Sequence, residues 1–218
     1  MSQTEVQLIK ADAVQTGDIA NSAVTDAKIS ALTASKLTGA LPAISGASLT
    51  NLPASGITHA RTYRLTTSYT LNAANATLTA NWEYDDSTGV GSLGSGWSLP
   101  SSGVFSFPAT GIYEVRAHTM WYGVAGTNTP YGGIHIEATT NNSSYASRSG
   151  AYSSQEYDNL NATRYHNVHI GALFDVTNVS NDKFRITTFR DVNYGDIVFM
   201  GNTADNYTYL EVIRLGDT

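Results

Sequence analysis

The residues in this sequence best suited to bind a metal or transfer a proton are five histidines, His59, His118, His135, His166 and His169. Only His166 and His169 are closely spaced, three positions apart. On a β-strand, residues i and i+3 point to opposite faces of the sheet. The surrounding sequence is typical of a strand, so we expect these two imidazoles not to share an ion and predict no metal site.

Carboxylates gather at Asp85-Asp86 and at Asp191 and Asp196, both near predicted turns. Calcium needs six to eight oxygen ligands, and a glycosidase needs a paired acid and base. Nothing distinguishes these carboxylates from solvated turn residues, so calcium is possible but unsupported and we expect no cofactor. The sequence also lacks a P-loop, a G-x-S-x-G elbow, an H-E-x-x-H motif and any cysteine, so we expect no enzyme.

A tyrosine-rich stretch between residues 123 and 167 is the best candidate for a binding surface. Its tyrosines alternate with Gly, Ser, Asn and Thr, a composition typical of adaptable recognition surfaces. Trp97 lies in a glycine-rich stretch, with Trp82, and both are expected to line a loop surface. The alternative is that the tyrosines are half-buried strand residues with their hydroxyls in water. The candidate receptor-binding residues are Tyr131, Tyr145, Tyr152, Tyr157, Tyr165 and Trp97.

The elements that position these residues are predicted to be β-strands. From residue 111 to 122, Tyr113, Val115 and Trp121 alternate with polar residues, which indicates a strand with one buried face. We predict further strands at 168–176 and 183–190, paired around the turn at 178–182, and at 197–200. The last strand, 207–215, carries apolar residues on both faces, which predicts a central strand or one near a subunit contact. The fold class is therefore all-β.

The stretch from Trp97 to Tyr113 resembles the signature G-x-F-x-x-P-x-x-G-x-Y of the complement globular-head and tumour-necrosis-factor-like domains. Gly103, Phe105, Pro108, Gly111 and Tyr113 match it position by position. The resemblance covers about residues 60–218 and implies a ten-strand jelly-roll sandwich that assembles as a homotrimer. Independently of the family, Pro108 must lie at a strand end or bulge, because proline cannot donate to a strand ladder.

Residues 1–58 contain no aromatic residue and carry a degenerate repeat of about nine residues, with one thin apolar stripe. Such a segment cannot bury enough surface alone. It is therefore either a disordered linker or an extended trimeric shaft. Together with the repeats, the stretch from Gly46 to Ala54 resembles shaft segments of bacteriophage tail fibres and other virion fibres. The resemblance implies attachment to other virion proteins through the N-terminus, for which the candidates are Val6, Leu8, Ile9, Val14 and Ile19.

Charge and hydropathy limit the kinds of partner that the protein can have. The net charge of −6 argues against nucleic-acid binding, no apolar run approaches the length of a membrane span, and the N-terminus has no secretion signal. We therefore expect a protein assembled in the host cytoplasm into a virion. The sequence predicts a shaft over 1–58 and a trimeric knob over 59–218 that attaches to a host-surface glycan or protein. The alternative is a head fibre or capsid decoration protein with a mainly structural role.

Overall fold

The computed structural model describes residues 56–124, 129–154 and 164–218. They belong to a unit of the chain that spans Leu52–Thr218, which is described by itself. The expected shaft lies outside the described residues except for its last three positions, so the boundary between 58 and 59 stays a prediction. The five candidate attachment residues, from Val6 to Ile19, also lie outside them. Within the described ranges, no helix has the length and apolarity to cross a membrane.

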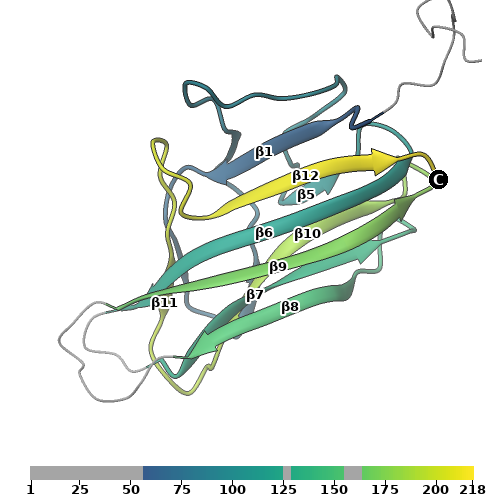
Figure 1. Cartoon of the computed structure of the whole chain (residues 1–218). Helices are drawn as coiled ribbons and strands as arrows, with labels where there is room; N and C mark the ends of the chain where they lie inside the picture. The colour runs from purple at the N-terminus through teal and green to yellow at the C-terminus, as the bar shows by residue number, and fades with distance from the viewer. Residues whose placement is uncertain (1–55, 125–128, 155–163) are drawn as a thin grey trace, which may run out of the picture. The chain divides into compact units, whose positions relative to one another are not determined.

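The described residues form two antiparallel sheets and no helix. Sheet A contains seven strands in the order β2-β11-β6-β12-β1-β4, with β9 added along the free side of β6. Figure 1 shows its long strands β12, β6 and β9 side by side. The bounds of its strands are β1 Ala60–Leu65, β2 Tyr69–Leu71, β4 Trp82–Tyr84, β6 Gly111–Gly123, β9 Tyr165–Val176, β11 Ile197–Phe199 and β12 Tyr209–Gly216.

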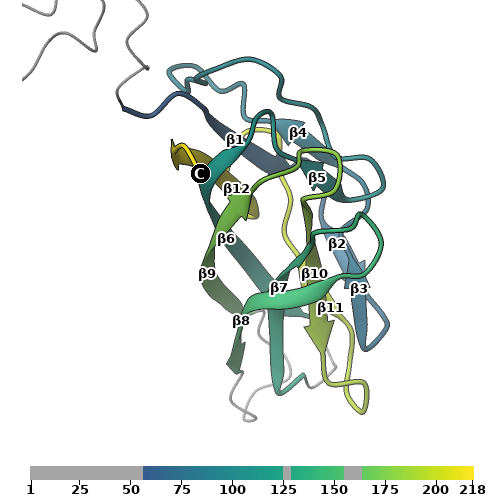
Figure 2. The ribbon, with the colours of Figure 1, turned by 90° about the vertical axis from the view of Figure 1, so that its right-hand side faces the viewer.

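Sheet B contains five strands in the order β3-β10-β7-β8, with β5 also paired to β10. Figure 2 shows the two sheets as separate layers, with β6, β9 and β12 in one and β10 and β7 in the other. The bounds of the sheet B strands are β3 Asn75–Thr77, β5 Val104–Ser106, β7 Tyr131–Thr139, β8 Ala146–Ser154 and β10 Lys183–Arg190. The prediction of an all-β jelly-roll sandwich is confirmed. The described residues form twelve strands rather than ten, and five of them are only three residues long.

The strand prediction for residues 111–122 is confirmed by β6, whose side chains alternate as expected. Tyr113, Val115 and Trp121 are buried, and the residues between them are more exposed. The closing strand β12 is a central strand of sheet A, because it lies between β6 and β1. This confirms the first of the two positions predicted for it. Its Leu210 and Val212 face the core, while Ile213 is half-buried on the other face.

One pairing prediction is wrong. The segments 168–176 and 183–190 are both strands, but β9 pairs with β6 in sheet A and β10 pairs with β7 in sheet B. The connecting turn is closed by Asp182, whose Oδ2 accepts hydrogen bonds from the backbone N–H groups of Thr177 and Asn178 at 2.8 and 2.7 Å. This carboxylate-closed turn carries the chain from one sheet to the other instead of closing a hairpin.

Aromatic side chains fill the space between the sheets. Phe105 of sheet B stacks on Phe184 with ring centroids 4.9 Å apart, and its ring also meets Trp82 edge-on at 5.3 Å. Phe107 contacts Tyr113 of sheet A at 4.8 Å and Phe184 of sheet B at 5.3 Å. Aromatic pairs of this kind contribute beyond the area that they bury. The signature aromatics therefore hold the two layers together. Trp82, expected on a loop surface, is buried in this core.

The turn before β6 requires a glycine. Gly111 has a φ of +141°, and a Cβ at this position would lie 2.5 Å from Arg214 Nε and 2.5 Å from the carbonyl oxygen of Gly216. A side chain would therefore meet both backbone strain and a steric clash. Pro108 lies between β5 and β6, outside any strand ladder, as the sequence predicted.

Candidate functional site

Strands β6, β8 and β10 end, and strands β7, β9 and β11 begin, at one end of the sandwich, which we call the tyrosine end. The described residues between β6 and β7 are joined there to the β10–β11 loop by hydrogen bonds, because Val124 N–H donates to the Asp196 carbonyl at 3.0 Å and the Thr129 hydroxyl donates to the Gly195 carbonyl at 2.6 Å. In Figure 1 this end lies opposite the C-terminus. The described tyrosines that define it are Tyr131, Tyr152, Tyr165 and Tyr194.

Tyr131 and Tyr152 form one aromatic pair at this end. Their ring centroids are 5.6 Å apart, and Tyr131 also lies 6.4 Å from the ring of Phe189. Tyr152 is 67% exposed at the end of β8. Gly133 makes room for the pair, because a Cβ there would lie 2.7 Å from Phe189 Cζ and 2.8 Å from Tyr152 Cα. The result is an aromatic surface open to solvent at the end of sheet B.

Tyr165 begins β9 on the other sheet and is 57% exposed. Its ring lies 5.6 Å from Tyr122, edge to face. Tyr194, 40% exposed in the β10–β11 loop, is part of the same end but was not predicted as a candidate. The turn at residues 193–196 could have predicted this exposure from the sequence, because a turn places its one aromatic residue, Tyr194, at the tip of a loop.

The remaining candidates lie elsewhere. Tyr145 is in the turn between β7 and β8, and the Arg185 guanidinium carbon lies 4.2 Å above its ring. Burial raises the pKa of Tyr145, with Arg185 acting in the opposite direction. Trp97 donates from Nε1 to the Leu93 carbonyl at 2.9 Å and packs edge-on against Tyr63. Tyr157 lies outside the described residues. The structure thus brings together Tyr131, Tyr152 and Tyr165, and leaves Tyr145 and Trp97 apart from them.

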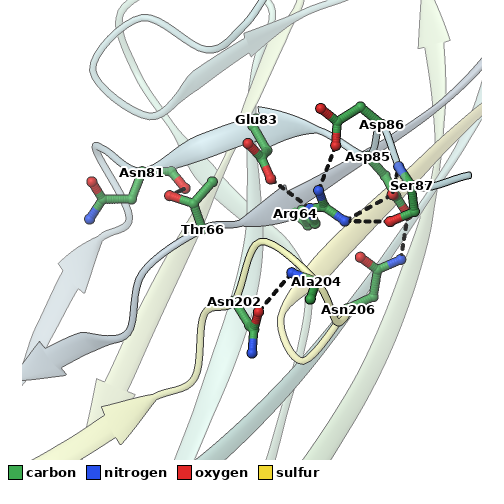
Figure 3. Close-up of polar contacts among 10 residues, drawn as sticks. All are labelled: Arg64, Thr66, Asn81, Glu83, Asp85, Asp86, Ser87, Asn202, Ala204 and Asn206. Atoms are coloured by element: carbon green, nitrogen blue, oxygen red, sulfur yellow. Dashed lines mark hydrogen bonds and ion pairs between the residues drawn. The ribbon is translucent and has the colours of Figure 1, made fainter.

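The carboxylates considered for chemistry are engaged with arginine. Figure 3 shows Arg64, which is 2% exposed, at the centre of the larger cluster. Its guanidinium donates to Glu83 at 2.6 Å, to Asp85 at 3.1 Å and to Asp86 at 2.6 Å. Burial by itself would raise the pKa of Asp85, but hydrogen bonds from Asn206 and Ser87 and the charge of Arg64 outweigh burial and leave the pKa lowered. These groups are arranged as a structural ion cluster.

The second carboxylate group is also committed to local contacts. Asp191 Oδ1 accepts from the backbone and the side chain of Asn193, both at 3.0 Å, and Asp196 pairs with the buried Arg190 at 3.0 Å. Among the residues that the structure describes, no three or more His, Asp or Glu side chains gather in a metal-binding group.

The two closely spaced histidines point to opposite faces, as predicted. The ring of His166 stacks on the core residue Trp121, with centroids 4.5 Å apart. His169 is exposed on the outer face of sheet A, directly opposite His118 of β6. No sequence pattern predicts this second pairing, since His118 and His169 are 51 positions apart and meet only through the register of the sheet.

The outer face of sheet A carries aromatic and apolar side chains as well as charge. Leu173 of β9 is 68% exposed and lies in one row of the sheet with Glu114 and Ile213. The next row holds Arg116, whose guanidinium donates to both carboxylate oxygens of Glu114 at 2.8 Å. His118, His169 and Tyr209 follow, with His118 5.0 Å from Tyr209. This surface combines the exposed Leu173 with the ion pair of Arg116 and Glu114 and with Glu211, which lies opposite Arg116.

Together, the two antiparallel sheets and their strand order define a jelly-roll β-sandwich of the tumour-necrosis-factor-like type. It is similar to the structure of Eiger TNF from S. frugiperda, with a TM-score of 0.56 and 12% identity over 75% of this chain and 95% of that one. It is also similar to murine APRIL at pH 5.0, with a TM-score of 0.50 and 11% identity over 72% and 98%. No protein-family model and no curated protein matches the sequence. The predicted fold of the C-terminal part is thus confirmed.

Proposed function

We propose that the chain is a structural protein of a bacteriophage virion, a homotrimeric fibre whose jelly-roll domain is displayed as a knob that attaches to the host surface. The first 58 residues form its shaft and contact other virion proteins. The protein is not an enzyme, and its partners are further copies of itself, virion proteins and a host-surface glycan or protein.

The placement of the exposed tyrosines carries this proposal. The chain enters the described domain at Gly56, and Ala60 at the start of β1 pairs with Ile213 near the end of β12. Tyr152 and Tyr165 lie at the other end of the strands, near the end of β8 and at the start of β9. Whatever precedes Gly56 is therefore attached at the end away from the tyrosines. This arrangement suits a knob that presents its binding residues outward.

The outer face of sheet A supports self-association. Large apolar side chains exposed together on a soluble domain mark an interaction surface, and paired charges such as Glu114 and Arg116 lower the cost of burying it. A threefold assembly also raises avidity for a surface-bound ligand, since weak sites engage together.

The test is binding of the assembled full chain to an array of bacterial surface polysaccharides. We expect binding that Tyr152→Ala and Tyr165→Ala weaken, since each removes an exposed ring from the tyrosine end. Tyr145→Ala is the matched control, because Tyr145 lies in the turn between β7 and β8 against Arg185, and it should bind like the parent. No binding by a well-folded trimer would argue against attachment and for the alternative of a mainly structural decoration protein.

A further inference from the structure

His118 and His169 form a cross-strand pair on the outer face of sheet A. They are directly opposite in the antiparallel ladder between β6 and β9. Their ring centroids are 4.1 Å apart and the ring planes are tilted by 44°. Side chains placed in this way have Cβ atoms about 4.5–5.5 Å apart. Two nitrogens that share one ion each lie about 2.0–2.1 Å from it, so binding requires the exposed His169 ring to turn from this position until one of its nitrogens and one of His118 face the same point.

The chemical state of His118 favours a metal ligand. Its Nδ1 is buried and has no hydrogen-bond partner among the described residues, which is costly for a polar atom. An imidazole binds a metal ion through the lone pair of such an unpartnered ring nitrogen. His169 is exposed and free to rotate one nitrogen toward the same point.

The surroundings leave room for water ligands on one side of His169. A hollow of about 270 Å³ lies there, lined also by Glu114, Arg116 and Gly171, and His118 does not line it. The positive charge of Arg116 does not oppose a cation strongly, because both carboxylate oxygens of Glu114 neutralise it. Gly171 adds no side chain to the hollow.

We propose that His118 and His169 of one chain bind one divalent transition-metal ion such as Zn²⁺, with water in the remaining positions. Two imidazoles select late first-row metals and disfavour Mg²⁺ and Ca²⁺, which prefer oxygen ligands. The site uses two residues of a single chain, and it shares the outer face of sheet A with the proposed contact surface between copies. It does not depend on host attachment.

The experiment is isothermal titration of Zn²⁺ into the full chain at pH 7.5, after dialysis against a chelator and then against metal-free buffer. The parent should bind one ion per chain, and His118→Gln and His169→Gln should each lose this binding. The matched control His135→Gln removes an imidazole that lies against Phe189 on sheet B, and it should bind like the parent. Binding should weaken at pH 5.5, where protons compete for the nitrogens.

Thermal unfolding provides a second measurement that does not depend on heat of binding. Zn²⁺ should raise the Tm of the parent and of His135→Gln, because it binds the folded state, and leave both pair variants unchanged. Mg²⁺ should raise none of them. Absence of zinc binding by the parent would overturn the proposal, as would equal binding by His169→Gln, the exposed member whose replacement leaves the core untouched.

Discussion

At the scale of single residues, Arg64 forms ion pairs with three carboxylates. It is nearly fully buried, yet it meets three carboxylates, so the cluster of Arg64, Glu83, Asp85 and Asp86 carries two more negative than positive charges. Removing one partner of a buried ion pair is far more costly than replacing both, because an uncompensated charge remains. The loop from Tyr84 to Ser87 is therefore held to β1 through one guanidinium.

We expect Arg64→Met to destabilise the domain by about 3–5 kcal/mol at pH 7, because three carboxylates then repel one another without their cation. The folded pKa of Asp85 is lowered, so its contribution to stability is present above the unfolded value of about 3.9 and is lost as the pH falls through the folded value. In the variant, protonation also relieves the repulsion. The difference in the free energy of unfolding between variant and parent should therefore become smaller below about pH 4, as measured by urea unfolding at pH 7 and pH 3.5.

The control for this prediction is Arg116→Met, which breaks the exposed pair with Glu114. Surface pairs contribute little to stability, so its unfolding midpoint should stay close to that of the parent. Equal losses in the two variants would show that burial of Arg64 is not what makes its cluster important.

At the scale of elements, β9 depends on β6 for its place in the sheet. It is added along the side of β6 that no other strand uses, and it pairs with β6 from Gly111 opposite Val176 to Tyr122 opposite Tyr165. Two half-buried histidines belong to this strand pair, His118 on the outer face and His166 against Trp121. Burial lowers the pKa of both, with His169 and Arg164 respectively adding to the effect.

We expect the metal-free domain to be less stable at pH 5 than at pH 7. A histidine whose folded pKa is lowered takes up its proton first in the unfolded chain, so stability is lost as the pH falls from about 6.5 toward the folded value. His118→Gln should show a smaller drop in Tm between pH 7 and pH 5, measured in a chelator by differential scanning calorimetry. The charged groups on neighbouring positions, Arg116 and Glu211, are unchanged in this variant. A drop as large as that of the parent would contradict the role of His118.

The strands themselves could be predicted from the sequence more readily than the pairings between them. Strict alternation revealed β6, because the two-residue period of a strand records which side is buried. The turn at 178–182 gave no such information: a turn of that composition closes a hairpin or carries the chain to another sheet, and only the packing of Phe174 and Phe184 across the core decides. The candidate tyrosines lie in sequence of the same composition. Only the fold shows that Tyr152 lies at the tyrosine end, whereas Tyr145 lies in the turn between β7 and β8. The two-histidine site had no sequence signal at all.

At the scale of the whole molecule, the two faces of the sandwich differ. The outer face of sheet A exposes Leu173 and carries the half-buried Ile213, and Glu114, which pairs with Arg116, lies between them. The outer face of sheet B carries the exposed aromatic pair of Tyr131 and Tyr152 at one end. Elsewhere on this face Arg185 and Thr187 both donate to Glu137. In the proposed homotrimer the aromatic end of sheet B is assigned to the host ligand, so we assign the contact between copies to the outer face of sheet A.

We expect Leu173→Arg to shift the full chain from trimer toward monomer in sedimentation velocity, because an unpaired charge replaces an exposed leucine on the proposed interface. The circular dichroism spectrum should not change, since Leu173 lies outside the core. The matched variant Leu99→Arg changes a leucine that is similarly exposed in the loop between β4 and β5, and it should leave the trimer intact. A monomeric parent, or a trimer that tolerates Leu173→Arg, would contradict this interface.

The two ends of the described domain are tied to each other. Arg214 donates its backbone N–H to the His59 carbonyl at 2.9 Å, and its guanidinium donates to the Thr58 hydroxyl at 3.1 Å. A short peptide from Thr218 back to the start of β1 would therefore close the domain into a ring without distorting either sheet. A circularly permuted version becomes feasible, and a cargo peptide fused after Thr218 would leave from the side away from Tyr152 and Tyr165.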